Sequence, residues 1–407
     1  MRKLIIMCST VFLITSLPSC GIEEEKISII KGSGSANSSL MVSFNELCSG
    51  EVEGFLGRGD QILVSRSSDG VYLLSAVDTT SKEEDVLIAV KNEQKCVPEI
   101  SQDGKKLLLN NVLIDIETKE TRTFPTVEEV VLPNPDGIPR PPSYSFIGSS
   151  EVVLTDPFFY IMKYYLTIAE AGSINAKNIE PEIKESFSKI QRPDIDHIIS
   201  PKLISEDLLY VFIGYRNNTQ GTYLYVLDLY EKKFKLLNEN VKTYRLSPDR
   251  KKIAYIKTNK GTPGSDTLIT INTDGTDKNE LVHMPHITGL EWSHSGGWIA
   301  LSAGEKGDCD INIIKSDGTH KEQLTHGMNP SGKLSWSYTG DKIAFTSGEG
   351  KPSPESRVYI IKLNIEDTSK IARSEPRNLE RVKMSKLLIE TLRKETDTLI
   401  DQSKKDS

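Results

Sequence analysis

A short pattern of apolar and polar residues recurs along the chain. Each copy has an apolar residue followed in the clearest copies by serine, then a turn, and then two or three apolar residues. The copies span residues 56–64, 100–109, 146–154, 204–210, 246–255, 292–301 and 336–345. Short apolar runs bounded by turn residues are typical of β-strands. The pattern therefore predicts an all-β fold made of repeats.

The spacing of the copies indicates which repeat fold this is. The first apolar residue after each turn is Ile62, Leu107, Val152, Leu208, Ile253, Ile299 and Ile343. Successive differences are 45, 45, 56, 45, 46 and 44 residues. A period of about 40 to 45 residues is typical of four-stranded propeller blades. We predict an all-β β-propeller of seven blades, or six if the degenerate first unit is only a partial blade. We also expect a strand near residues 40–44 to close the ring against the last unit.

The sixth unit shows the four strands expected of a blade, at residues 289–293, 298–303, 310–315 and 321–325. Asp317-Gly318 joins the third to the fourth strand, and this dipeptide tolerates the positive φ angles of a tight hairpin. A lone four-stranded sheet leaves both faces wet, so the blades must pack face to face.

The clearest copy is Ser247-Pro248-Asp249-Arg250-Lys251-Lys252-Ile253-Ala254-Tyr255. It resembles the repeat of TolB-like β-propellers, which are related in architecture to WD-repeat proteins. The resemblance is strongest over residues 246–362 and weak before Cys96. It implies the propeller fold and no particular function. Only about 25 residues of the expected mature chain precede the first unit, so the α/β domain of TolB itself is not expected, and membership of the Tol system is not implied.

The N-terminus has the features of a bacterial lipoprotein signal. Met1-Arg2-Lys3 is followed by an apolar stretch at 4–17, which is shorter than the roughly 20 residues that span a bilayer. Leu17-Pro18-Ser19-Cys20 resembles a lipobox, in which the cysteine receives the lipid, although Pro18 departs from the usual pattern. The alternative is an ordinary signal peptide with a chance cysteine. The resemblance implies lipid attachment at Cys20, and Gly21 in place of Asp favours the outer membrane, facing the periplasm or the cell surface, if the organism is Gram-negative.

These features divide the chain into four parts. They are a signal peptide at 1–19, a flexible tether at 20–40, the propeller at 41–375 and a helical tail at 376–407. The tail has an apolar stripe and is expected to pack on the propeller's rim, or else to bind a partner. An insertion within 173–192 is either a partner surface or a decorative loop.

Charge and cysteine content limit the partners. The formal charge is −7, and loss of Arg2 and Lys3 with the signal makes it −7 − 2 = −9. An acidic chain is a poor ligand for polyanions, so we expect no nucleic-acid partner. Cys48 and Cys96 can form a disulfide across the first unit; three unpaired thiols, with Cys309, are the alternative.

Motifs for catalysis are missing from the sequence. There is no Gly-x-Ser-x-Gly, no glycine-rich phosphate loop and no Cys-x-x-Cys pair. His283 and His286 are expected to be ordinary surface histidines rather than metal ligands, and Asp308 and Asp310 to lie in a solvated turn rather than a calcium loop. Trp292 and Trp336 are expected in the core, the alternative being a ligand-stacking position. We therefore predict no enzyme activity, no cofactor and no bound metal.

Two functions remain open at this stage. The first is a lipid-anchored cell-envelope protein whose rigid propeller binds another envelope protein or a peptide. The second is a propeller enzyme or sugar-binding protein, similar to lyases or lactonases, that uses a metal in the axial pocket.

Overall fold

The computed structural model describes most of the predicted propeller region. The described residues are 40–57, 60–68, 70–91, 98–101, 103–109, 112–123, 143–147, 151–155, 168–169, 197–205, 209–216, 221–228, 233–259, 261, 264–305, 308–347 and 356–365. All regular elements in these residues are β-strands. No helix among them is long and apolar enough to cross a membrane. The predicted signal peptide, the tether before residue 40, the insertion at 173–192 and the C-terminal helix lie outside the described residues.

The described strands form seven antiparallel sheets, six of four strands and one of three. The first three sheets are β2 (Glu51–Leu56), β3 (Gln61–Ser68), β4 (Val71–Asp78), β5 (Glu84–Lys91); β6 (Pro98–Ile100), β7 (Lys106–Leu109), β8 (Val112–Asp115), β9 (Thr121–Thr123); and β10 (Ser143–Ile147), β11 (Glu151–Thr155), β12 (Ile168–Ala169). The next three are β13 (His197–Ser205), β14 (Leu209–Arg216), β15 (Gly221–Asp228), β16 (Lys233–Glu239); β17 (Val241–Leu246), β18 (Lys252–Thr258), β19 (Ser265–Asn272), β20 (Asn279–Pro285); and β21 (Gly289–Trp292), β22 (Trp298–Glu305), β23 (Asp308–Lys315), β24 (Lys321–Gln323). The seventh is β25 (Pro330–Trp336), β26 (Lys342–Ser347), β27 (Arg357–Leu363) and, from the start of the chain, β1 (Met41–Ser49).

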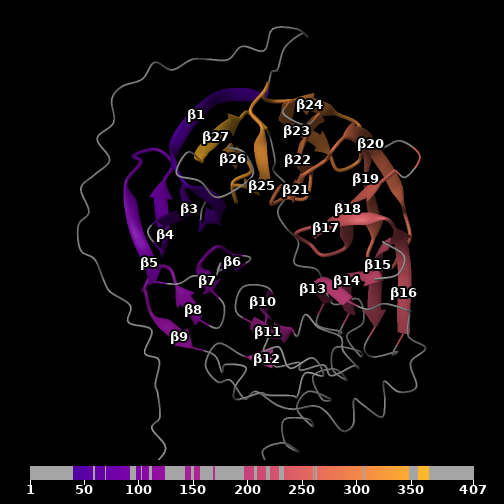
Figure 1. Ribbon diagram of the computed structural model, residues 1–407, viewed down its shortest axis with the longest axis horizontal. Coiled ribbons are helices and arrows are strands. Elements are labelled where there is room, and N and C mark those ends of the chain that lie inside the picture. The colour runs from indigo at the N-terminus through magenta and orange to yellow at the C-terminus, as the bar shows by residue number, and fades with distance from the viewer. Residues whose placement is uncertain are drawn as a thin grey trace, which may run out of the picture.

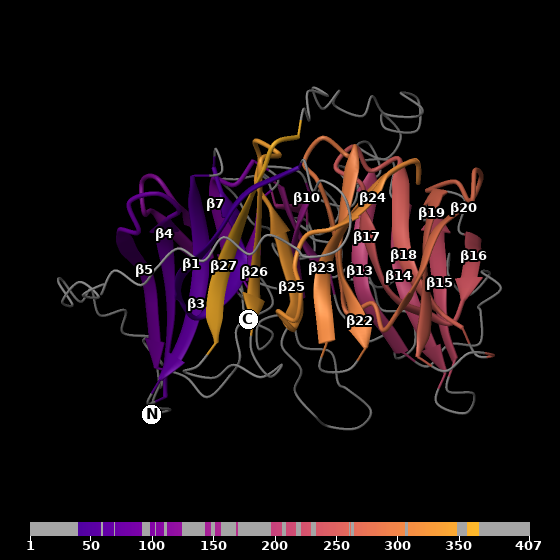
Figure 2. The same ribbon diagram turned by 90° about the horizontal axis from the view of Figure 1, so that it is seen from above.

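The sheets follow one another around a common axis, as Figure 1 shows, with the first strand of each sheet nearest the centre. In the edge-on view the strands run roughly along that axis (Figure 2). This arrangement confirms the predicted all-β propeller of sheet-like blades. Seven sheets in the described part of the chain agree with seven blades, but residues between the third and fourth sheets are not described, so the number of blades stays a prediction.

The predicted repeat frame matches the strand register. Each apolar residue before a turn pairs with the first apolar residue after it: Phe55 with Ile62, Ile100 with Leu107, Phe146 with Val152, Leu246 with Ile253, Trp292 with Ile299 and Trp336 with Ile343. In the fourth sheet the equivalent pair is Leu203 with Tyr210. The predicted position there, Leu208, lies outside the described residues. The repeat in that sheet is therefore placed two residues later than its sequence suggested.

A buried serine explains why the turn motif recurs. In the turn after β17, Ser247 N–H donates to Lys252 O at 2.9 Å, and Lys252 N–H donates back to Ser247 Oγ at 2.9 Å. The same pair of bonds closes the turns that begin at Ser101, Ser293 and Ser337. All four serines are at most 5% exposed. Because a buried N–H must find an acceptor, the serine hydroxyl is needed at that position.

The hydrophobic core lies between neighbouring sheets. On one face of β18, Ile253 and Tyr255 pack against Val211 and Ile213 of the preceding sheet. On the other face, Ala254 and Ile256 pack in one cluster with apolar residues of the following sheet, among them Ile299 and Leu301. Second strands are covered on both faces, which is why their sequences are continuously apolar rather than alternating.

The N-terminal strand closes the ring, as the sequence predicted. β1 pairs antiparallel with β27, from Met41 opposite Leu363 to Ser49 opposite Arg357. The Phe44 ring stacks on Tyr359, with ring centroids 5.2 Å apart. The chain then enters β2, whose Val52 N–H donates to Thr346 Oγ1 of the last sheet at 2.8 Å. Two ends of the chain are thus held in one sheet.

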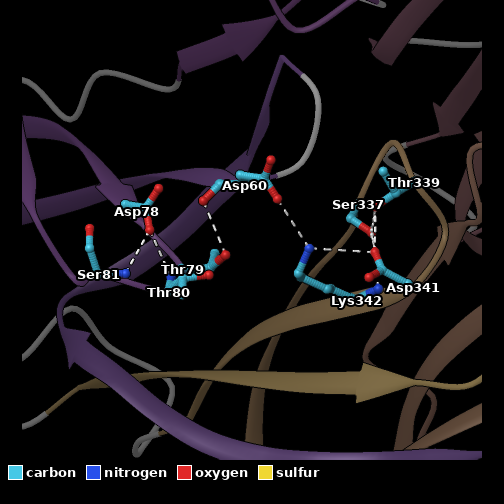
Figure 3. A network of polar contacts seen from close by, with 9 residues as sticks. All are labelled: Asp60, Asp78, Thr79, Thr80, Ser81, Ser337, Thr339, Asp341 and Lys342. Atoms are coloured by element: carbon cyan, nitrogen blue, oxygen red, sulfur yellow. Dashed lines mark hydrogen bonds and ion pairs between the residues drawn. The ribbon is translucent and has the colours of Figure 1, made fainter.

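Polar contacts also join the first and last sheets at this closure (Figure 3). Lys342 Nζ lies 3.4 Å from Asp60 Oδ1 and 3.5 Å from Asp341 Oδ1. Asp60 also accepts, through its carbonyl oxygen, the Thr79 hydroxyl at 3.0 Å. Lys342 is only 14% exposed, so it forms a largely enclosed link between the sheets.

Candidate functional site: charged side chains around the axis

One position of the innermost strands repeats around the axis. It directly precedes the apolar residue of the turn motif and pairs with the second strand in the same register. Its occupants and their partners are Glu99 with Leu108, Lys202 with Val211, Arg245 with Ala254, Glu291 with Ala300 and Ser335 with Ala344. Four of these five residues are charged. Two further charged residues lie on innermost strands: Glu53, beside a bulge in β2, and Lys333, two residues before Ser335 in β25.

We call Glu53, Glu99, Lys202, Arg245, Glu291 and Lys333 the axial charge ring. Its members come from six different innermost strands and pair between sheets. Arg245 Nε lies 3.3 Å from Glu291 Oε2, Lys202 Nζ lies 3.0 Å from Glu99 Oε1, and Lys333 is paired with Glu53. Side-chain exposures of 29–49%, with Glu53 lower at 7%, show that solvent reaches most of the ring.

Glu99 connects three sheets. Its Oε1 accepts the Phe146 N–H of β10 at 3.1 Å and the ammonium of Lys202 in β13. Ser335 acts similarly at the closure, where its Oγ accepts the Phe55 N–H of β2 at 3.0 Å. In both cases a side chain on the innermost strand of one sheet accepts a backbone N–H from the innermost strand of the next sheet.

Glu291 lies in a distinct electrostatic environment. Burial raises the pKa of its carboxyl group, while Arg245 and Lys333 oppose that shift. A half-enclosed carboxylate with two cations near it can exchange its cation partners for a ligand's charged groups.

Turn residues of different sheets contact one another at one end of the axis. Tyr338 donates its hydroxyl to Ser101 O, in the second sheet's turn, at 3.2 Å. The His294 ring lies edge-on to Tyr338, with centroids 4.7 Å apart. Burial raises the pKa of Tyr338 above its usual value, and Asp103 and Glu291 add to the shift. Tyr338 thus lies between two turns and the charge ring.

Arg250 departs from the repeat at this same end. The equivalent residues of three other turns are Gly104, Gly296 and Gly340, with φ between 69° and 77°. Arg250 adopts φ 56°, which costs a non-glycine residue about 1–2 kcal/mol. Its side chain interacts electrostatically with Glu99, whose sheet lies across the axis in Figure 1, and burial lowers the pKa of its guanidinium. Arg250 therefore combines an unfavourable backbone conformation with a partly buried charge at this end of the axis.

The sequence analysis missed this ring, although a signal was present. In four repeats the residue before the apolar-Ser pair is visible in the sequence as Glu99, Arg245, Glu291 or Ser335. Single charges on strands are usually solvated, and only the ring brings these residues together.

The predicted cysteine sites are largely outside the described residues. Cys20 and Cys96 are not among them. Cys48 is a half-buried free thiol in β1, and burial raises its pKa to about 11. The Cys48–Cys96 disulfide and lipid attachment at Cys20 therefore stay predictions.

The two histidines singled out in the sequence are exposed. His283, on β20, has its Nδ1 2.8 Å from Thr267 Oγ1 of β19, and His286, just after β20, donates its backbone N–H to Gly264 O at 2.9 Å. Among the described residues, no three or more His, Cys, Asp or Glu side chains converge as metal ligands.

The tryptophans are core residues, as expected. Trp292 and Trp336 are 4% and 6% exposed, and Trp292 Nε1 donates to Arg245 O at 3.2 Å. The expectation for Asp308 and Asp310 was wrong. Both lie in β23 rather than in a turn, and Asp310 is 6% exposed, with Thr325 Oγ1 donating to it at 2.8 Å.

Comparison with known proteins shows similarity in structure alone. No protein-family model matches the sequence, and no curated protein matches it. An oligogalacturonate lyase in complex with manganese superposes with a TM-score of 0.54 at 12% identity, covering 79% of this chain and 91% of the lyase. The oligogalacturonate lyase of Vibrio parahaemolyticus gives 0.51 at 14% identity, covering 80% and 93%. TolB from Acinetobacter baumannii gives 0.40 at 14% identity, covering 75% and 64%.

These structures correct one prediction. The absence of hydrolase and phosphate-binding motifs led us to predict no enzyme activity, but the two lyases are enzymes with the same fold. A propeller can place catalytic groups at its axis without any of those motifs, so their absence does not argue against catalysis.

The axial carboxylates do not form a manganese site of their own. Glu53, Glu99 and Glu291 are each paired with a lysine or arginine, and no third metal-ligating side chain joins any of them among the described residues. We therefore derive no chemical step through a metal.

Proposed function

We propose that this is a lipid-anchored protein of the bacterial cell envelope whose propeller binds a peptide or protein segment at the axial charge ring. The observation that carries the proposal is the charged set at repeat-equivalent positions of the innermost strands. Partly exposed ion pairs contribute only about 0–1 kcal/mol each to stability. The recurrence of charge at one register position in four innermost strands is better explained by ligand recognition.

The chemistry of the ring favours a ligand with charges of both signs. Three cations, Lys202, Arg245 and Lys333, pair with three carboxylates, Glu99, Glu291 and Glu53. A peptide with acidic and basic side chains can replace each internal pair with a pair of its own. Charge-assisted hydrogen bonds of this kind contribute about 1.5–3 kcal/mol each.

The binding test uses the full-length lipidated protein in detergent micelles. Fluorescently labelled peptides of mixed, all-acidic, all-basic and neutral composition are titrated by fluorescence anisotropy. We expect the mixed peptides to bind best, and Arg245→Gln to weaken them about tenfold or more. Lys321→Gln, on an exposed outer strand, is the matched control. Equal affinity of wild type and Arg245→Gln for every peptide would count against the proposal.

Arg250→Gly tests the same site with less risk to the fold. It introduces the residue that the equivalent turns carry, so the fold should tolerate it, while the electrostatic interaction with Glu99 is lost. We expect weaker peptide binding with an unchanged thermal unfolding midpoint or a higher one.

The anchor is tested separately. Cys20→Ala removes the acceptor of the lipid, and each buried CH₂ of an acyl chain contributes about 0.8 kcal/mol to membrane binding. We expect the variant to move to the soluble fraction on cell fractionation. Membrane association equal to that of wild type would refute the lipobox interpretation.

A second candidate is an enzyme that acts on an acidic sugar at the same place. The specific observations are the fold shared with two oligogalacturonate lyases and a carboxyl group of raised pKa, Glu291, beside Arg245 and Lys333. A carboxylate could remove the proton next to the sugar's carboxylate, and the cations could stabilise the charge that develops.

The enzymatic test incubates the full chain with oligogalacturonate, with and without added Mn²⁺, and follows the ultraviolet absorbance of unsaturated products. Absorbance that rises with wild type and not with Glu291→Gln would support this candidate. No product under either condition would exclude this substrate.

A further inference from the structure

The ring has two rims with different connections. In each complete blade, the first and second strands are joined at one rim, and so are the third and fourth. We call it the turn rim; in the fifth sheet it holds residues 247–251 and 273–278. The second and third strands are joined at the opposite rim, which we call the loop rim and which includes Gly261.

The described chain begins at the turn rim. β27 is the third strand of its sheet and ends there, since Leu363 N–H donates to Asp341 O, in the turn between β25 and β26, at 2.7 Å. Met41 pairs with Leu363, and Leu40 O accepts the Asn364 N–H at 2.7 Å. Leu40 therefore leaves the ring at the turn rim.

We infer that the propeller lies on the membrane with its turn rim toward the lipid bilayer. The inference rests on the proposed lipid at Cys20, about 20 residues before Leu40. A flexible chain of 20 residues has a root-mean-square span of about 25 Å. A tether that short holds the rim from which it leaves nearer the bilayer than the opposite rim.

The axial charge ring remains accessible in this orientation. Tyr338 and Arg250 lie at the turn rim, where Tyr338 donates to Ser101 O and Arg250 interacts electrostatically with Glu99. With this rim toward the lipid, a ligand approaches the ring from the loop rim. The end of the axis that holds Tyr338 and Arg250 is then the anchored end.

The test measures the distance of each rim from the lipid in vesicles. Two positions of the fifth sheet are exposed and form a matched pair: Lys278 at the turn rim and Gly261 at the loop rim. Lys278→Cys and Gly261→Cys are made in a background with Cys48, Cys96 and Cys309 changed to Ser. Each is labelled with the same fluorophore after lipidation at Cys20, and reconstituted with lipids that carry a headgroup quencher.

We expect stronger quenching at residue 278 than at residue 261. Equal quenching, or stronger quenching at 261, overturns the orientation while leaving the anchor and the ligand site intact. The Cys20→Ala version of each variant separates the two proposals. If this version still binds vesicles, the lipid anchor is wrong and the orientation loses its basis. If it does not bind, the difference in quenching between residues 278 and 261 comes from protein held by the lipid at Cys20.

Discussion

The buried serine of each turn shows how one side chain maintains the repeat. Ser101, Ser247, Ser293 and Ser337 each accept the N–H of the residue that starts the second strand. An apolar residue would fit the space but would leave that N–H without a partner. The leucine, isoleucine or tryptophan before each serine varies freely in size, whereas the hydroxyl recurs, because hydrogen bonding is more specific than packing.

Ser293→Ala should lower the free energy of unfolding by about 1–3 kcal/mol, because the Trp298 N–H is left buried without its acceptor. Urea denaturation monitored by tryptophan fluorescence measures the change. Ser331→Ala makes the same substitution at an exposed position and should stay within about 0.5 kcal/mol of wild type. Equal stabilities for the two variants would show that the serine bond is dispensable.

Two hairpins of the first sheets depend on a carboxylate. Asp78 Oδ1 accepts the backbone N–H groups of Thr80 and Ser81 at 2.8 and 2.7 Å. Asp115 Oδ1 accepts those of Glu117 and Thr118 at 3.1 and 2.9 Å. These bonds favour the ionised form, and the bond from Thr118 is the main reason that the pKa of Asp115 is lowered.

Stability should therefore fall at acid pH through Asp115. A folded-state pKa below the unfolded value stabilises the fold above about pH 4, and this contribution is lost as the pH falls through the folded-state pKa. Asp115→Asn cannot ionise, so its urea midpoint should fall less than that of wild type between pH 6 and pH 3. Glu117→Gln, at an exposed position of the same turn, is the control. A wild-type slope in Asp115→Asn would contradict the assignment.

The strands of a blade differ in what they contact. Second and third strands supply most of the core; the second strands are almost continuously apolar, whereas third strands also bury polar residues such as Asp266 and Asp310. First strands pack their apolar residues against a neighbouring sheet and carry the charged axial residues near the turn. The outermost strand β1 also closes the ring, because it pairs with β27 of the last sheet.

Phe44→Ala tests that closure. The ring stacks on Tyr359 and lies 6.2 Å from Phe345, and its removal leaves part of this cluster unfilled. We expect a loss of about 2–3 kcal/mol in stability and faster proteolytic cleavage before residue 50. Val42→Ala, on the same strand at a residue 58% exposed, should change neither quantity. Cleavage rates that stay equal would indicate that β1 does not close the ring.

For the molecule as a whole, closure means that residues 48 and 358 are neighbours. Cys48 pairs directly with Val358 in the antiparallel register. Opposite residues of such a pair have Cα atoms about 4.5–5.5 Å apart, which a disulfide can span. The structure therefore offers a covalent test of the ring that uses a native cysteine.

Val358→Cys in a Cys96→Ser background should form a disulfide with Cys48 on oxidation. Because burial raises the pKa of Cys48 to about 11, the reaction should be faster at pH 9 than at pH 7. The bond closes a very long loop, so the oxidised form should exceed the reduced form in stability by about 3–5 kcal/mol. Mass spectrometry identifies the bond. Its absence, with Cys309 paired instead, would show that β1 is misplaced.

The sequence alone determined the fold class, the order of strands and turns within each blade, and the closing strand near residue 40. The reason is that these follow from local requirements repeated many times: a serine acceptor, a left-handed turn residue and apolar runs for strands buried on both faces. One repeat was misplaced, around Leu208, because its Ile204-Ser205 pair lies one residue after the register position of the motif, Leu203, and its strand β13 has an irregular register.

Only the tertiary structure decided the site. Glu99, Lys202, Arg245 and Glu291 are separated by more than 40 residues from one another in sequence, and each alone is an ordinary strand charge. Closing the ring brings them to one axis, where they form ion pairs between sheets and where burial raises the pKa of Glu291. Likewise, Arg250 is a turn residue in the sequence, and only the closed ring places its guanidinium opposite Glu99. The sequence could set which residues lie next to one another in a blade; contacts across the axis exist only once the blades have closed.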